Sequence, residues 1–276
     1  MPQVRSTLRL MAVLVCCMFL GIIHVLGIFL ELANKLNLTS RKARLFRARC
    51  MALLFRIFTK SIRIDIKTDL GDMKSLPDEN FLLLANHVNY LDIIVLAAIH
   101  PLGFVAKSEI ESWPGLGPII KAMNTIFVER DSMWGRIRCI RDLEAGLKHT
   151  SYCIFPEGTT SDKDAPALDL WKHGNIFAVK KERHRIFTAA IRYEDHKEMA
   201  WIDDMELLPH LWKTLQKKRI LVSIRIRELK YRKEDTENLR ALSLKAHESV
   251  CISAESLKVA VDNSHHLSSL LPTTQV

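Results

Sequence analysis

Short apolar runs alternate with amphipathic segments from residue 61 onward. Residues 62–67 alternate apolar and polar positions, which predicts a half-buried strand, and the continuous run at 81–85 predicts a central strand covered on both faces. Further strands are expected at 103–106, 125–129, 152–155, 186–192 and 219–227. Helices are expected at about 92–99, after Asp131 or Ser132, at about 171–182, and from Asp235 or Thr236 to about Val261, together with a helix that is broken near Trp113-Pro114. This alternation favours an α/β fold with a largely parallel central sheet flanked by helices.

An apolar run near the N-terminus departs from this pattern. Residues 10–30 contain His24 as their only strongly polar side chain, and about 20 such residues are needed to cross a bilayer. A cleaved signal peptide is the alternative, because Arg5 and Arg9 would form its basic start. The apolar part of a signal peptide is usually only about 7–15 residues long. We therefore expect a retained helical anchor that either crosses the membrane or enters one leaflet.

Residues 41–60 predict a second, basic helix. Arg49, Arg56 and Lys60 recur on one helical stripe. A second stripe is apolar and consists of Leu45, Ala48, Met51, Ala52, Phe55 and Phe58. Such a helix is expected to lie among lipid head groups, although it could instead pack its apolar face on the folded domain. We favour the first interpretation, which makes residues 1–60 a membrane anchor and residues 61–276 the folded domain.

The net charge of +9 is confined to the N-terminal part of the chain. Residues 1–60 hold ten basic residues and one acidic residue, a difference equal to the whole net charge, so residues 61–276 are balanced. A nucleic-acid-binding domain more often spreads basic residues over its folded face, whereas a basic segment beside an apolar run suits an anionic membrane surface. We therefore expect membrane lipids, and no nucleic acid, as partners.

The cysteines give no sign of a metal site. The six cysteines form no CxxC pair and no spacing typical of zinc sites. They are Cys16, Cys17, Cys50, Cys139, Cys153 and Cys251. We expect unpaired thiols in a reducing compartment.

The first polar motif, NHVNYLD at residues 86–92, directly follows the predicted strand at 81–85. His87 is a natural general base near neutral pH. Asp92 could accept the second N–H of the imidazole, which would fix its tautomer and orient the ring. Alone, the pattern is also compatible with a structural His87 beside an Asp92 that caps a helix.

The second motif, NTIFVERD at residues 124–131, predicts a strand with Arg130 at its carboxyl end. A guanidinium in that place can bind a phosphate with two parallel hydrogen bonds. Alone, the motif equally allows a solvated Arg130 or one that pairs with Asp131.

The third motif, FPEGTTS at residues 155–161, follows another predicted strand. Gly158 permits a tight turn and a close approach of backbone N–H groups to an anion. Thr159 and Ser161 add hydroxyl donors, and Glu157 can orient a substrate group or a neighbouring base. Alone, the motif could be a simple turn.

No motif for an enzymic nucleophile accompanies these three. The chain has no GxSxG, P-loop, GxGxxG or HExxH pattern. The simplest explanation is that the substrate brings its own hydroxyl for the base to activate.

In this order the motifs resemble those of the glycerol-phosphate and lysophosphatidate acyltransferase family. That family has an N-H-x-x-x-x-D motif followed by I-F-[VI]-x-R and F-P-E-G-T, and NHVNYLD, IFVER and FPEGT match them here. The stretch FVAKSE at 104–109 is also similar. The resemblance covers about residues 80–225, with weaker similarity through the N-terminal anchor.

The resemblance implies a membrane-bound O-acyltransferase. His87 would deprotonate the acceptor hydroxyl, which attacks an acyl thioester directly, and Asp92 would orient His87. Arg130 and Lys107 would hold the acceptor phosphate. The other implied substrate-binding residues are Asn86, Glu157, Gly158, Thr159 and Ser161. The donor would be acyl-CoA or acyl-carrier protein, with no cofactor and no metal, and the catalytic domain would face the cytosol from the inner membrane or its equivalent.

The favoured acceptor is 1-acylglycerol 3-phosphate, which would give phosphatidate. Two departures from the family pattern leave room for another lyso-lipid, such as an amino-acid-containing one. A glycine that often opens the second motif is Asn124 here, and residues 187–191 lack the proline of a V-P-V-type strand. A non-catalytic membrane-binding protein on the same fold, or a thioesterase in which water replaces the lipid hydroxyl, are the alternative functions.

Overall fold

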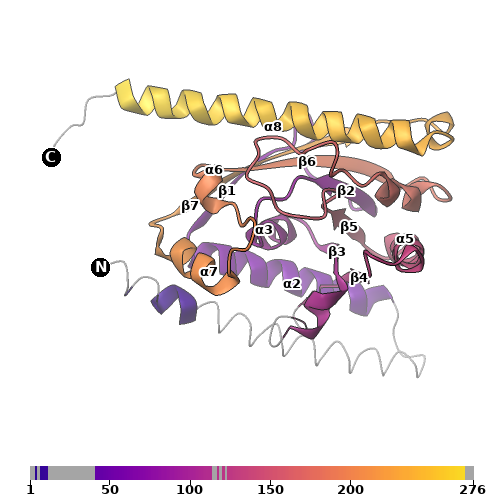
Figure 1. Ribbon diagram of the computed structural model, residues 1–276, viewed down its shortest axis with the longest axis horizontal. Helices are drawn as coiled ribbons and strands as arrows, with labels where there is room; N and C mark the ends of the chain where they lie inside the picture. The colour runs from indigo at the N-terminus through magenta and orange to yellow at the C-terminus, as the bar shows by residue number, and fades with distance from the viewer. Residues whose placement is uncertain are drawn as a thin grey trace.

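The computed structural model describes residues 4, 7–11, 41–113, 117, 120–121 and 123–270, without the side chains of 41–48 and 263–270. Its centre is a seven-stranded sheet in the order β1-β7-β6-β2-β5-β3-β4 (Figure 1). The strands are β1 Ile64–Asp69, β2 Phe81–Ala85, β3 Leu102–Lys107, β4 Ile126–Val128, β5 Ser151–Ile154, β6 Arg185–Tyr193 and β7 Ile220–Leu229.

The sheet is mostly parallel, as the sequence predicts. Strands β6, β2, β5, β3 and β4 run in one direction. Strand β7 is antiparallel to β6 and parallel to β1, so β1 and β7 form a reversed pair at one side of the sheet. Consequently, the starts of β1 and β7 lie at the same edge of the sheet as the carboxyl ends of the other five strands.

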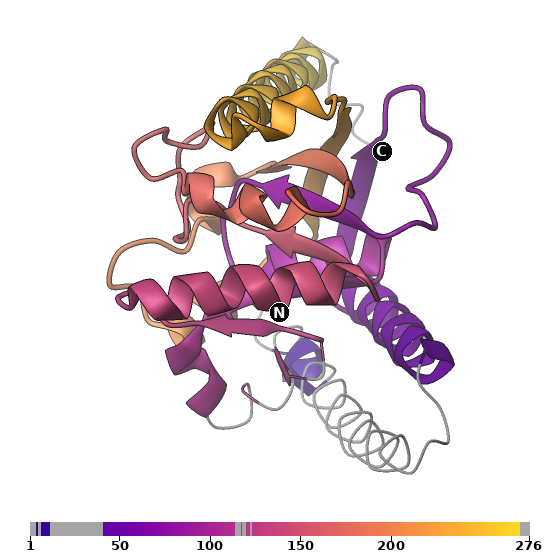
Figure 2. The same ribbon diagram turned by 90° about the vertical axis from the view of Figure 1, so that its right-hand side faces the viewer.

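Helices cover both faces of this sheet (Figures 1 and 2). The helices with described bounds are α2 Arg41–Ser61, α3 Leu91–Ile99, η1 Ser108–Ser112, α5 Met133–Leu147, η2 His173–Val179, α6 His196–Met199, α7 Leu207–Gln216, η3 Glu234–Thr236 and α8 Leu239–Leu270. Helix α8 lies on the face opposite α2 and α7 (Figure 1).

Strand β2 shows why the sheet is central. All five of its residues are buried. Phe81, Leu83 and Ala85 enter the core cluster shared with α2 and α3, while Leu82 and Leu84 enter the cluster shared with α5 and α8. Successive side chains of a strand point to opposite faces, so the continuous apolar run supplies both layers of the core.

The apolar face of α2 packs on the folded domain, so the favoured placement of that face among lipids was wrong. Met51, Ala52, Phe55 and Phe58 are buried, and α2 contacts α3 and β1. Burial on the domain removes these side chains from water as effectively as a bilayer would. The rest of the predicted stripe, Leu45 and Ala48, lies outside the described side chains.

Several predicted elements differ from the observed ones in extent. Strand β1 begins at Ile64, because Ile62 and Arg63 form a turn after α2. The helix expected at 171–182 is the shorter 3-10 helix η2. Helix α8 begins at Leu239, later than predicted. Asn238 is its N-cap, because its side chain accepts a hydrogen bond from the Ala241 amide at 3.0 Å. Of the two caps considered for α5, Ser132 is the one observed.

No helix in the described part of the chain combines the length and apolar character needed to cross a bilayer. Apart from Leu10 and Met11, the apolar segment predicted at 10–30 lies outside the described residues. The cysteines that the structure describes are all free thiols, and Cys139 and Cys153 are buried.

Candidate active site

His87 and Asp92 form a hydrogen-bonded pair just beyond the end of β2. The imidazole Nδ1 lies 2.8 Å from the Asp92 Oδ2. Asp92 is fully buried, whereas 16% of the His87 side chain is exposed. With Nδ1 bound to the carboxylate, Nε2 is the nitrogen left to exchange a proton with a substrate.

Asp92 also shapes the turn that presents the histidine. Its Oδ2 accepts from the backbone N–H groups of Val88 at 2.6 Å and Asn89 at 3.0 Å. The Asn89 side chain accepts from the Leu91 amide at 2.7 Å, which closes the turn into α3. The two interpretations of the motif are therefore compatible, because Asp92 both caps the turn and holds the imidazole.

Tyr193 supplies a further contact to this carboxylate. Its hydroxyl donates to the Asp92 Oδ1 at 2.8 Å from the carboxyl end of β6. Burial raises the pKa of Tyr193 well above its usual value, so the phenol stays protonated and remains a donor. Tyr193 was not among the residues predicted from the sequence. Its position at the end of a predicted parallel strand was the available signal.

The third motif packs against the histidine. The ring of Phe155 stacks on the imidazole with 3.9 Å between centroids. The backbone N–H of Ser161 donates to the His87 carbonyl at 2.8 Å. These contacts on the ring and the main chain hold His87 in place, so the loop that follows β5 is part of the base's support.

Glu157 is buried beside this pair. One carboxylate oxygen accepts from the Ala167 N–H at 3.0 Å. Burial raises the pKa of Glu157, and the Ala167 amide and the His87 imidazole partly offset that effect. Glu157 thus links two parts of the loop after β5, near the His87 imidazole.

Arg130 joins the second motif to the third. It follows β4, and its guanidinium donates to the carbonyl of Gly158, across the end of the intervening strand β3. Gly158 adopts a left-handed φ of 73°, which glycine tolerates best. The arginine side chain remains exposed. Burial of part of the group lowers the pKa of Arg130, while Glu109 and Asp131 act in the opposite direction.

Lys107 ends the neighbouring strand β3 and lies level with Val128 of β4. Its ammonium is 2.6 Å from a Glu109 carboxylate oxygen, and both side chains are about half exposed. Thr159 is exposed, and the Ser161 hydroxyl accepts from the Lys163 amide at 3.1 Å. The substrate contacts predicted for Lys107, Thr159 and Ser161 stay predictions.

Asn86 is used inside the protein. Its amide donates to the Ile191 carbonyl at 3.0 Å and accepts from the Ile191 N–H at 2.7 Å. The residue is buried and ties the end of β2 to β6. Both hydrogen-bonding sides of the amide are engaged here, so its predicted contact with substrate stays a prediction.

The backbone at Asn124 gives one departure from the family pattern a physical reason. Asn124 has a φ of 54°, a conformation that asparagine and glycine adopt more readily than other residues. A glycine and an asparagine are therefore interchangeable in this turn.

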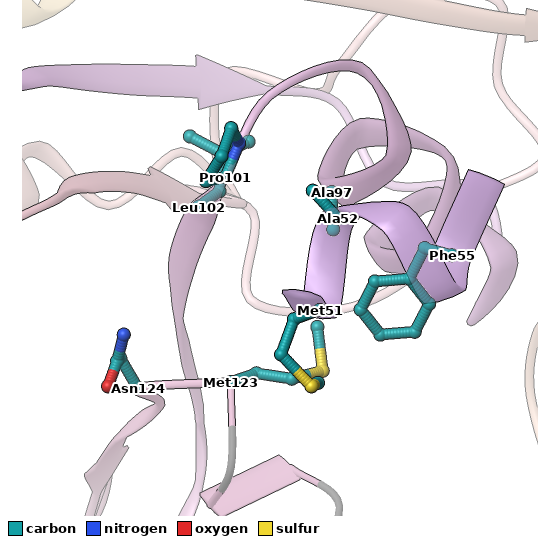
Figure 3. A pocket seen from close by; sticks show the side chains of 8 residues that line it. All are labelled: Met51, Ala52, Phe55, Ala97, Pro101, Leu102, Met123 and Asn124. Atoms are coloured by element: carbon teal, nitrogen blue, oxygen red, sulfur yellow. The ribbon is translucent and has the colours of Figure 1, made fainter. Parts of the chain in front are cut away.

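Asn124 also borders a small apolar cavity between α2, α3 and the start of β3 (Figure 3). At about 10 Å³ this cavity has no room for an acyl chain.

The site thus holds a buried carboxylate bound to an imidazole, with cations nearby, at the carboxyl edge of a mostly parallel sheet. This arrangement suits general-base chemistry. Comparison with known proteins identifies the family. Residues 67–194 match the Acyltransferase family model. This segment, a little under half of the chain, is similar to that family.

The curated relatives are lipid acyltransferases. A lyso-ornithine lipid O-acyltransferase of Pseudomonas aeruginosa is 32% identical over 157 residues, which cover 55% of this chain and 60% of the relative. A 1-acyl-sn-glycerol-3-phosphate acyltransferase of Neisseria gonorrhoeae is 28% identical over 170 residues, which cover 58% of this chain and 64% of the relative. The matched segments span less than two thirds of these relatives.

A solved structure shares the fold. The crystal structure of the 1-acyl-sn-glycerophosphate (LPA) acyltransferase PlsC from Thermotoga maritima superimposes with a TM-score of 0.59 at 19% identity. The match covers 94% of this chain and 98% of that chain. The resemblance deduced from the three motifs is thereby confirmed at the level of family and fold.

Proposed function

We propose that this protein transfers a fatty acyl group from acyl-CoA or acyl-carrier protein to the free hydroxyl of a lyso-lipid. The contact between the His87 Nδ1 and the Asp92 Oδ2, at 2.8 Å, carries the proposal. It leaves the other ring nitrogen directed away from the carboxylate and able to accept a proton. No cofactor or metal takes part.

In the proposed reaction the His87 Nε2 takes the proton of the acceptor hydroxyl. The hydroxyl oxygen attacks the thioester carbonyl and forms the new ester bond as the carbon–sulfur bond breaks. The proton returns from the imidazolium to the departing thiolate. Asp92 stabilises the imidazolium throughout, and no acyl-enzyme forms.

The acceptor that we propose first is 1-acylglycerol 3-phosphate, giving phosphatidate. Arg130 and Lys107 end neighbouring strands and are the cations available to its phosphate. A guanidinium offers a phosphate two parallel hydrogen bonds. In this assignment Arg130 exchanges its contact with the Gly158 carbonyl for one with the ligand.

A lyso-ornithine lipid is the second candidate acceptor, and one observation favours it. Glu109 pairs with Lys107 at 2.6 Å and also lies near Arg130. A site of mixed charge suits a head group that carries both an amine and a carboxylate. The name of the Pseudomonas aeruginosa relative agrees with this candidate.

We also propose that the enzyme works at the cytosolic face of a membrane, where its lyso-lipid acceptor resides. The apolar run at 10–30 and the basic excess of residues 1–60 support this location. Deletion of residues 1–60 would also remove α2 from the core, so its effect on membrane binding must be read together with a folding measurement.

An acceptor screen with the purified full chain tests the proposal. Labelled acyl-CoA is offered with 1-acylglycerol 3-phosphate, lyso-ornithine lipid or no acceptor. We expect acyl transfer to one lyso-lipid and its loss in His87→Ala. Turnover unchanged in His87→Ala would refute the role of the base. Loss of acyl-CoA without any acceptor would identify a thioesterase, and inactivity with every acceptor would favour a non-catalytic protein.

A further inference from the structure

A basic hollow lies at the sheet edge that also carries the catalytic pair. It has a volume of about 310 Å³ and is lined by Lys60, Arg63, Ile64, Asp65, Lys218 and Arg219. Four cations thus face one carboxylate. Lys60 lies in the last turn of α2, Arg63 precedes β1, and Lys218 and Arg219 precede β7. Two stretches that are distant in sequence, residues 60–65 and 218–219, bring their positive charge to one place.

These four cations form no ion pair with any residue that the structure describes. A contrast is provided by Arg225 and Arg227 further along β7, which both donate to Asp69. Neutralised arginines of that kind have little charge left for a ligand. The hollow is different because its one acid, Asp65, leaves most of the positive charge uncompensated.

Arg63 occupies its place at a cost in backbone energy. Its φ is 58°, in the left-handed region that residues other than glycine and asparagine rarely adopt. The turn is held by hydrogen bonds from the Arg63 N–H to the Lys60 carbonyl and from the Ile220 N–H to the Arg63 carbonyl. In this conformation Arg63 lines the hollow together with Lys218 and Arg219.

The strand topology places this hollow at the same edge as His87. Tyr193, which donates to Asp92, lies opposite Val222 in the antiparallel pair β6 and β7. The Glu194 N–H donates to the Leu221 carbonyl at 3.0 Å, just beyond that register. Arg219 is therefore only a few residues from the strand end that supports the catalytic carboxylate.

Exposed apolar side chains belong to an N-terminal stretch that contacts Lys218, one of the residues that line the hollow. Arg9 is buried and donates to the carbonyls of Leu215, Lys217 and Lys218, which fixes the N-terminal helical stretch against the end of α7 (Figure 1). From that stretch, three side chains at spacings of four and three are more than half exposed. They are Val4 at 61%, Leu8 at 63% and Met11 at 58%.

We propose that this edge docks on an anionic bilayer, with a lipid phosphate in the hollow formed by Lys60, Arg63, Lys218 and Arg219. The exposed apolar side chains of the N-terminal stretch enter the head-group region, as expected where apolar and basic groups adjoin. The bilayer then faces the same edge as His87. The inference deepens the proposed function, because it gives a membrane-resident acceptor a short path to the base.

Vesicle binding of the full chain tests this docking without any need for turnover. Vesicles of phosphatidylcholine alone are compared with vesicles in which about a third of the lipid is phosphatidylglycerol. The neutral vesicles serve as the reference for binding through the N-terminal apolar run. We expect the wild type to bind the phosphatidylglycerol vesicles more tightly than the neutral ones. In the double variant Lys218→Gln/Arg219→Gln, we expect this gain in affinity to be smaller by about tenfold or more.

The matched control is Lys230→Gln/Lys233→Gln. It removes the same charge from the far end of β7, where Lys230 follows Leu229. Because charge effects decay over a Debye length of about 8 Å, we expect this control to change the increment less than about twofold. Equal losses in the two variants, or no effect of phosphatidylglycerol on the wild type, would overturn the docking surface.

Arg63→Asn provides a second probe that keeps the fold. Asparagine suits the left-handed φ better than arginine, so we expect unchanged or greater thermal stability together with weaker phosphatidylglycerol dependence. Inorganic phosphate added at the same concentration as the lipid should not compete. If it abolishes the increment, the hollow binds free phosphate and the membrane assignment is wrong. The acyltransferase proposal would survive either failure, because it rests on transfer that depends on His87.

Discussion

The two sides of the active site are built in different ways. On the base side, Asp92 is fully buried and accepts hydrogen bonds from two backbone amides, an imidazole and a phenol. On the cation side, Arg130 follows the edge strand β4 and Lys107 ends its neighbour β3. Both side chains are exposed, and each makes one short polar contact within the protein. Buried hydrogen bonds fix geometry, whereas exposed side chains can reorient for a ligand.

This difference suggests how one family can keep its chemistry and change its acceptor. The proposed base is held by buried groups, so a change there disrupts many contacts at once. The cations stand on the rim, where a substitution disturbs little else. The names of the relatives fit this division, since they share an acyltransferase activity but specify different lyso-lipids.

The largest effect is expected from Asp92→Asn. The variant keeps the shape of the side chain but removes the negative charge that stabilises the imidazolium. We expect kcat to fall by about 10²–10⁴-fold, measured with saturating donor and acceptor. Circular dichroism checks that the secondary structure of the variant matches that of the wild type. A loss below about tenfold would mean that the pair is structural and that the contrast between the two sides is wrong.

Arg130→Gln tests the cation side with the next largest effect. If the guanidinium binds the acceptor phosphate, its removal should raise the KM for 1-acylglycerol 3-phosphate by about 10–100-fold, because charge-assisted hydrogen bonds contribute about 1.5–3 kcal/mol. The kcat should change little. Arg138→Gln, an exposed change on α5, is the control. An effect on kcat alone would place Arg130 on the base side of the comparison.

Tyr193→Phe sharpens the account of the base side. Loss of the phenolic donor leaves Asp92 with one hydrogen bond fewer, and we expect kcat to fall by about tenfold with an unchanged acceptor KM. Tyr231→Phe is the matched control, since it also loses one hydrogen bond, to the His184 carbonyl, away from the site. Similar activity losses in the two variants would reduce Tyr193 to a stabilising residue.

The smallest effect is expected from Lys107→Gln. The ammonium is about half exposed and already paired with Glu109, and such surface pairs contribute only about 0–1 kcal/mol. We expect less than about a fivefold rise in acceptor KM. A loss as large as that of Arg130→Gln would show that Lys107 moves onto the acceptor and that the cation side acts as a unit.

Much of the catalytic side could be predicted from sequence because its parts are local. His87 and Asp92 lie in one turn, and the buried strand before them reads directly as an apolar run. The sheet class followed from the alternation of strands and helices. The two reversed strands were not predictable in the same way, because the direction of β7 depends on how the connections on either side of it cross the sheet.

The sequence by itself determined the pairing of His87 with Asp92 and the three strand ends that meet around it, since parallel strands place their carboxyl ends at one edge. Only the tertiary structure revealed the contact from Tyr193, the burial of the apolar face of α2, and the hollow shared by Arg63 and Arg219. The physical reason is distance along the chain. Periodicity reports which residues are buried, but packing alone decides which distant residues become neighbours.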